Sequence, residues 1–147
     1  MKKDETTRSL SKVLEQVRAP HEAERFISEY TERTPLLFCQ YINSLIAEKN
    51  IPLPEVISNS GISKNYVYNI LNGTRRNPGR DKVIALCIGA KANYKQLQRA
   101  LELANVPPLY PKSERDARIA IAVNNAVDNV TALNYLLDSF NLEPLDI

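Results

Sequence analysis

Polar side chains with recognition chemistry recur at helical spacing between residues 63 and 72. Lys64, Asn65 and Asn69 fall on one face of the helix expected there. Val67 and Ile70 fall on the other face. An asparagine amide can form two hydrogen bonds with the edge of adenine, and a lysine can donate to the acceptors of guanine. The pattern therefore suits a helix that reads base edges.

Positive charge is concentrated around the same helix. Residues 63–82 carry five basic side chains against the single acid Asp81, a net charge of +4, whereas the whole chain has +2. Residues 112–147 are acidic, with a net charge of −3. A basic stretch of this kind favours contact with phosphates. A solvated surface without a partner is the alternative interpretation.

The composition gives little support to catalytic or metal chemistry. His21 is the only histidine, and Cys39 and Cys87 are the only cysteines, too few for a histidine metal site or a disulfide scaffold. No glycine-rich phosphate loop and no nucleophile–base pair can be assembled. We expect no enzyme activity, no catalytic residue, no cofactor and no metal. The chain has no apolar run long enough for a bilayer and no apparent secretory signal, so a cytoplasmic location without a membrane is expected.

Apolar periodicity predicts helices almost throughout, with no strands, and hence an all-α fold. The expected helices cover residues 9–19, 21–33, 36–49, 53–60, 63–72, 80–88, 93–105, 113–126 and 128–140.

Capping and turn residues mark where these helices should begin and end. Gly61, Gly73 and Gly89 are expected at turns or helix ends. The expected N-terminal signals are Thr34 followed by Pro35, Asn93 with Gln96, Ser113 with Asp116, and Asp128.

The segment IPLPEVISNSGISKNYVYNILNG, residues 51–73, has the layout of a helix-turn-helix. Together with the following loop TRRNPGR, residues 37–90 resemble the lambda-repressor/Cro-like, Xre-type family of bacterial DNA-binding regulators. The resemblance implies a five-helix domain over residues 36–105, with its third helix in the major groove. Residues 107–147 are similar to a C-terminal helical extension found in some helix-turn-helix regulators of Gram-positive bacteria.

The resemblance also implies roles for particular residues. Base contacts are expected from Lys64, Asn65 and Asn69. Backbone contacts are expected from Thr74, Arg75, Arg76 and Arg80, and also from Ser63 and Tyr66 at the start of the reading helix. Two positions depart from the family pattern: Ile57 stands where a small residue is usual, and Ser60 where an apolar one is usual.

The expected organisation is an N-terminal helical extension (1–34), a DNA-binding domain (35–106) and a C-terminal helical pair (107–147). The expected function is a sequence-specific transcriptional regulator, most simply a repressor that binds double-stranded DNA as a homodimer. Either helical extension is a candidate dimer surface. The alternative is a helical adaptor for a protein partner, such as a toxin or a signalling kinase, which would explain Ile57 and Ser60 as drift.

Overall fold

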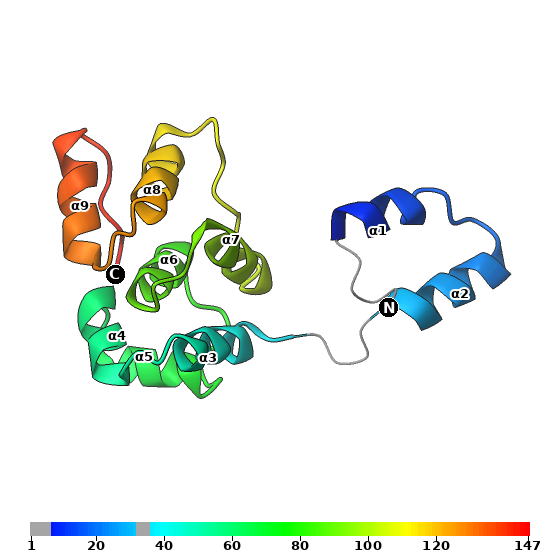
Figure 1. The fold of residues 1–147 in the computed structure, drawn as a ribbon, viewed down its shortest axis with the longest axis horizontal. Coiled ribbons are helices and arrows are strands. Elements are labelled where there is room, and N and C mark those ends of the chain that lie inside the picture. Colours follow the sequence, from blue (N-terminus) through cyan, green and yellow to red (C-terminus); the bar gives the residue numbers. More distant parts are fainter. Residues whose placement is uncertain (1–6, 32–35) are drawn as a thin grey trace. The chain divides into compact units, whose positions relative to one another are not determined.

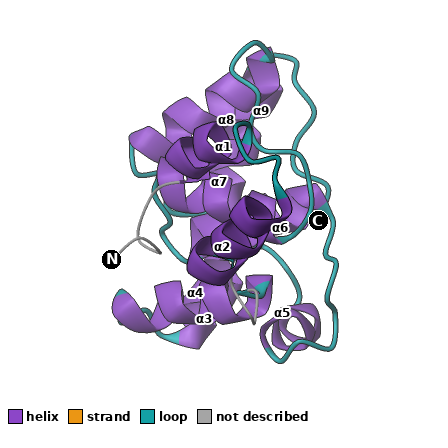
Figure 2. Ribbon diagram, turned by 90° about the vertical axis from the view of Figure 1, so that its right-hand side faces the viewer, coloured by secondary structure: helices purple, strands orange, loops and turns teal. Residues whose placement is uncertain are grey.

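The computed structural model describes residues 7–31 and 36–147, and every regular element in these ranges is an α-helix. The nine helices found there, without a strand, confirm the expected all-α class (Figures 1 and 2). None of these helices is both long and apolar enough to cross a membrane. The chain divides into two compact units, residues 1–35 and 36–147. Thr34 and Pro35, expected to begin a helix, lie outside the described residues.

The described part of the first unit is a pair of helices, α1 (Thr7–Leu14) and α2 (Pro20–Tyr30). The first is shorter than expected, because the N–H groups of Gln16 and Val17 bond carbonyls three residues back, in a turn and not an α-helix. The second begins at Pro20, one residue before the expected start, at a position where the missing N–H of proline costs nothing. No side chain of either helix is buried.

Seven helices form the second unit: α3 (Phe38–Glu48), α4 (Leu53–Ser60), α5 (Lys64–Leu71), α6 (Arg80–Gly89), α7 (Tyr94–Leu103), α8 (Glu114–Asn124) and α9 (Val130–Ser139). At its centre lies α6, which packs against α4, α7 and α9 (Figure 1). Its residues from Val83 to Gly89 are all buried. A helix that is apolar on every side is expected in the middle of a core.

Two of the expected glycine turns are present. Gly61 follows α4 with φ of +69°, and Gly73 follows α5 with φ of +83°, a region that favours glycine. Gly89 is the last residue of α6, so this helix ends where expected. Gly89 itself is helical, and the left-handed position after α6 is Lys91, with φ of +57°.

Gly89 instead permits a close approach between α6 and α4. A Cβ at this position would lie 2.6 Å from the carbonyl oxygen of Val56 and 3.2 Å from the Cβ of Ser60. Ser60 is fully buried, and its hydroxyl donates to the carbonyl of Ile57 at 2.9 Å and accepts the N–H of Ile62 at 3.1 Å. The small size of serine and its satisfied hydroxyl explain how a polar residue is accommodated at this buried position.

Two of the expected N-terminal caps are present, at α7 and α8, and two helices begin differently. The helix expected from residue 36 after Thr34 begins at Phe38, because Leu37 is extended and forms its N-cap. Asn93 and Gln96 form a capping box at the start of α7, and Ser113 caps α8. Asp128 does not cap α9, because the side-chain oxygen of the neighbouring Asn129 accepts the N–H of Ala132 at 2.7 Å.

The segment 107–147 belongs to the same compact unit as α3 to α7. Its buried side chains are continuous with their core, among them Leu109, Ile119, Leu133 and Leu137. The irregular segment after α9, residues 142–147, also packs against this core through Leu145. The C-terminal helices therefore help to hold α4, α6 and α7, against which they pack.

Candidate nucleic-acid interface

One face of α5 is turned outward, as the spacing predicts. Val67 and Ile70 are completely buried, which fixes the rotation of the helix. Lys64, Asn65 and Asn69 are exposed. Among the described residues neither asparagine amide has a hydrogen-bond partner, and the Lys64 ammonium has no ion pair. The outward face of the helix thus carries one cation and two side-chain amides whose donors and acceptors are free to bind a ligand.

The start of α5 is fixed by Ser63, whose hydroxyl accepts the N–H of Tyr66 at 3.4 Å. The hydroxyl is therefore already used in capping, although the residue is exposed.

The loop after α5 folds back against it. The side-chain oxygen of Asn72 accepts the N–H of Thr74 at 2.8 Å, and the N–H of Arg75 donates to the carbonyl of Asn69 at 2.9 Å. These bonds keep the loop beside the outward face of the helix. Thr74, Arg75 and Arg76 are all exposed there, so the structure brings together most of the side chains expected to contact DNA.

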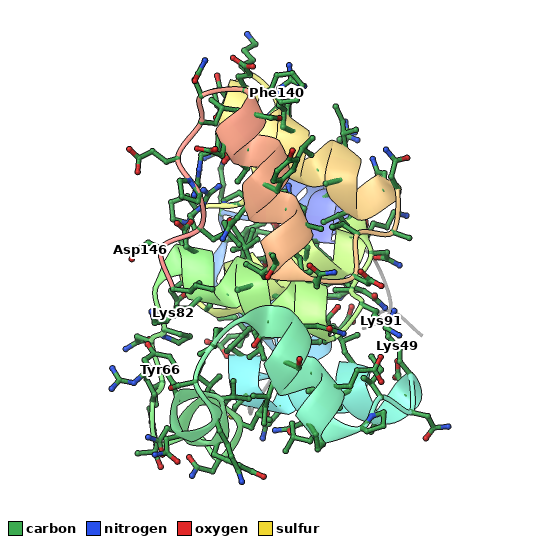
Figure 3. All side chains as sticks on the ribbon, turned by 90° about the vertical axis from the view of Figure 1, so that its left-hand side faces the viewer. Lys49, Tyr66, Lys82, Lys91, Phe140 and Asp146 are labelled. Carbon is green, nitrogen blue, oxygen red and sulfur yellow. The ribbon has the colours of Figure 1, made fainter. Side chains whose placement is uncertain are left out.

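Tyr66 carries two cations on its ring. The guanidinium carbon of Arg75 lies 4.5 Å from the ring centroid, and the ammonium nitrogen of Lys82 lies 5.0 Å from it. Figure 3 shows Tyr66 and Lys82 on the same edge of the unit. Lys82 belongs to the basic stretch 63–82, but the sequence predicts no DNA contact for it. Its proximity to Tyr66 depends on how α6 packs beside α5, which local spacing does not show.

Arg80, which was expected to contact phosphate, is already hydrogen-bonded within the protein. Its guanidinium donates to both carboxylate oxygens of Asp116, at 2.7 and 3.2 Å, and to the carbonyls of Pro107 and Pro108. These acceptors occupy the fork of the arginine and neutralise its charge. Arg80 therefore joins α6 to the C-terminal segment and is not available to a phosphate in this conformation.

A second pair of the same kind lies beside it. Arg115 donates to both oxygens of Asp81, at 3.0 and 3.3 Å, and to the carbonyls of Glu143 and Pro144. Two Arg-Asp dipeptides, 80–81 and 115–116, thus pair crosswise between α6 and α8. The repeated dipeptide is the only trace of this arrangement in the sequence, and it does not indicate which charge pairs with which.

The pairing with Arg80 also determines the charge of Asp116. Burial alone would raise the pKa of this carboxyl, but the Arg80 hydrogen bond, the N–H of Tyr110 and the charges of Arg80 and Arg115 together hold its pKa below the ordinary value of 3.8. The carboxylate is therefore ionised at neutral pH, and its negative charge offsets the positive charge of Arg80.

Other reactive groups do not converge at this surface. Burial raises the pKa of the Cys87 thiol to about 12, so this thiol stays protonated. In the described ranges no three His, Cys, Asp or Glu side chains gather as a metal site would need. Comparisons with models of protein families, with curated proteins and with solved structures give no match to this chain.

Proposed function

We propose that this protein is a sequence-specific double-stranded DNA-binding regulator of transcription, with α5 in the major groove. One observation carries the proposal: Lys64, Asn65 and Asn69 are exposed on the outward face of α5, beside an exposed cationic loop. Lys64 has no ion pair in the described chain, and its ammonium lies 5.8 Å from the ring centroid of Tyr68. In this function the helix reads base edges, while Arg75, Arg76 and Lys82 contact phosphates beside it.

We also propose that α3 to α7 form a lambda-repressor-like helix-turn-helix domain. The helices α3 to α7 follow one another in the order expected of a lambda-repressor-like domain. The Gly61 turn stands between α4 and α5, and Val56, Val67 and Ile70 are fully buried. These features support a helix-turn-helix in which α5 is the recognition helix.

Regulation by such a domain normally needs two copies. A single recognition helix contacts only a few base pairs, and two-fold operators with half-sites about one helical turn apart supply the rest. We therefore propose a homodimer that acts most simply as a repressor, in the cytoplasm with the chromosome.

Selection from a random duplex library at about 150 mM salt tests this function. Enrichment of a two-fold-symmetric motif is the expected result. A single ungapped half-site would keep DNA reading and remove the dimer. A folded protein that enriches no sequence would contradict the proposal.

A helical adaptor for a protein partner is the second candidate. It is favoured by exposed apolar side chains near the C-terminal helices: Tyr110, Ile121 and Tyr135 are 58, 56 and 79% exposed. Salt separates the two functions, because phosphate contacts weaken steeply as salt rises and an apolar protein interface does not.

A further inference from the structure

A cavity of about 500 Å³ opens beside the proposed DNA-contacting loop. It lies between the start of α3, the residues that follow α5, and the end of α7. Cavities of this size are typical of sites for small organic molecules.

The polar lining of this cavity consists mainly of hydrogen-bond donors. Asn72 uses its side-chain oxygen to accept the N–H of Thr74, which leaves its amide N–H groups without a partner in the described chain. The Asn77 and Asn105 side chains have no hydrogen bond there either. Arg76 adds an exposed guanidinium with no carboxylate paired to it.

None of the described residues that line the cavity is acidic, and its two charged side chains, Arg75 and Arg76, are both cationic. The nearest carboxylate along the chain, on Glu102, is not in the lining and is already paired with Arg99 at 3.0 Å. A bound anion would meet donors without a competing negative charge.

The rest of the lining is apolar. Leu37 is 50% exposed at the start of α3, and Phe38 and Leu103 continue the same surface inward. Inorganic phosphate would leave this surface in water, whereas an apolar group attached to the anion would cover it.

We propose that this cavity binds a small organic anion, with an acidic group on Arg76 and the asparagine amides and an apolar body against Leu37 and Leu103. Arg76 is also a proposed phosphate contact, so the ligand and DNA compete for it. Binding of the anion does not depend on the proposed function. Only the competition with DNA rests on that function.

The test uses the full chain and the fluorescence of anilinonaphthalene sulfonate, an aromatic anion of this class. The dye is expected to bind, and octanoate to displace it. Inorganic phosphate and octanol each supply only half of the ligand, and should displace the dye at concentrations at least about tenfold higher than octanoate.

Arg76→Gln and Leu37→Ser are each expected to weaken octanoate binding by about fivefold or more. The matched controls are Lys112→Gln, an exposed cation elsewhere, and Leu36→Ser, the exposed neighbour outside the lining. Equal affinities in the test and control variants would overturn the proposal. Displacement by phosphate as readily as by octanoate would also overturn it, as would failure of the dye to bind.

A parallel titration measures duplex binding with and without octanoate. Weaker DNA binding in the presence of octanoate supports competition. Unchanged DNA binding by the protein saturated with octanoate would overturn the proposed competition. If octanoate binds as expected but no duplex is bound at all, the proposed function fails and the cavity assignment stands.

Discussion

Basic side chains near α5 differ in whether the protein already neutralises them. The guanidinium of Arg80 donates to Asp116 and to two carbonyls. Arg76, in contrast, is exposed and has no ion pair in the described chain. Arg75 and Lys82 stand between these extremes, held over the Tyr66 ring but still charged. The same residue type therefore stabilises the fold at position 80 and stays available to a ligand at position 76.

Arg76→Gln and Arg80→Gln should separate these roles. We expect Arg76→Gln to weaken binding to all duplexes alike, with no change in protein stability, because it removes one phosphate contact. Arg80→Gln should instead lower the free energy of unfolding and leave the salt dependence of DNA binding unchanged. Duplex titrations and urea unfolding of both variants check this. A loss of salt dependence in Arg80→Gln would restore it as a phosphate contact.

Asp116 should make stability depend on pH at the acidic end. Its pKa is lower in the folded than in the unfolded chain, so its contribution is present above about pH 4 and is lost as pH falls through the folded pKa. Asp116→Asn is expected to cost about 3 kcal/mol at pH 7, as breaking a largely buried pair does. It should also reduce the acid-induced loss of stability.

Urea unfolding between about pH 3 and pH 7 measures this effect. Glu114→Gln is the control, since its exposed pair with Arg118 contributes about 0.5 kcal/mol or less. The same acid dependence in Asp116→Asn and the wild type would contradict the assignment.

Helices and their ends could largely be predicted from the sequence, whereas contacts between distant helices could not. The bounds of α4, the Gly61 turn and the box of Asn93 with Gln96 follow from local spacing, because capping partners lie within a few residues. The role of Gly89 could not be predicted, since it depends on the carbonyl of Val56 in another helix. The bonds of Arg80 could not be predicted for the same reason, because its partner is Asp116, in α8.

A side chain at Gly89 should therefore separate α6 from α4. Gly89→Ser is expected to cost about 1–3 kcal/mol or more, because its Cβ would meet backbone that cannot move away cheaply. Gly79→Ser is the matched control: nothing lies within 4 Å of its Cβ position, and serine is favoured where α6 begins. Thermal unfolding compares the two. Equal stabilities would show that the close approach does not constrain the packing.

At the scale of the whole chain, charge is segregated although the net value is only +2. The acidic C-terminal segment contributes Asp116 to the core side of α6, while exposed cations remain around α5. Composition therefore understates the field near the proposed DNA surface, where local charge determines association.

Arg75, Arg76 and Lys82 together predict the salt dependence of DNA binding. Three phosphate contacts in each bound copy should make log K fall with log salt with a slope of about −3 per copy, from roughly −0.9 per contact. Titrations of one duplex between about 50 and 200 mM salt measure the slope. A slope near zero would favour the adaptor function.

The most direct measurement selects random duplexes with the wild type and with Asn65→Ala in parallel. A two-fold motif is expected from the wild type. The variant should keep the motif but lose preference at one base pair in each half-site, because an amide contact to a base is worth about 1–3 kcal/mol there. If the wild type enriches no motif, or if the variant enriches the identical one, then α5 does not read DNA through Asn65 as proposed.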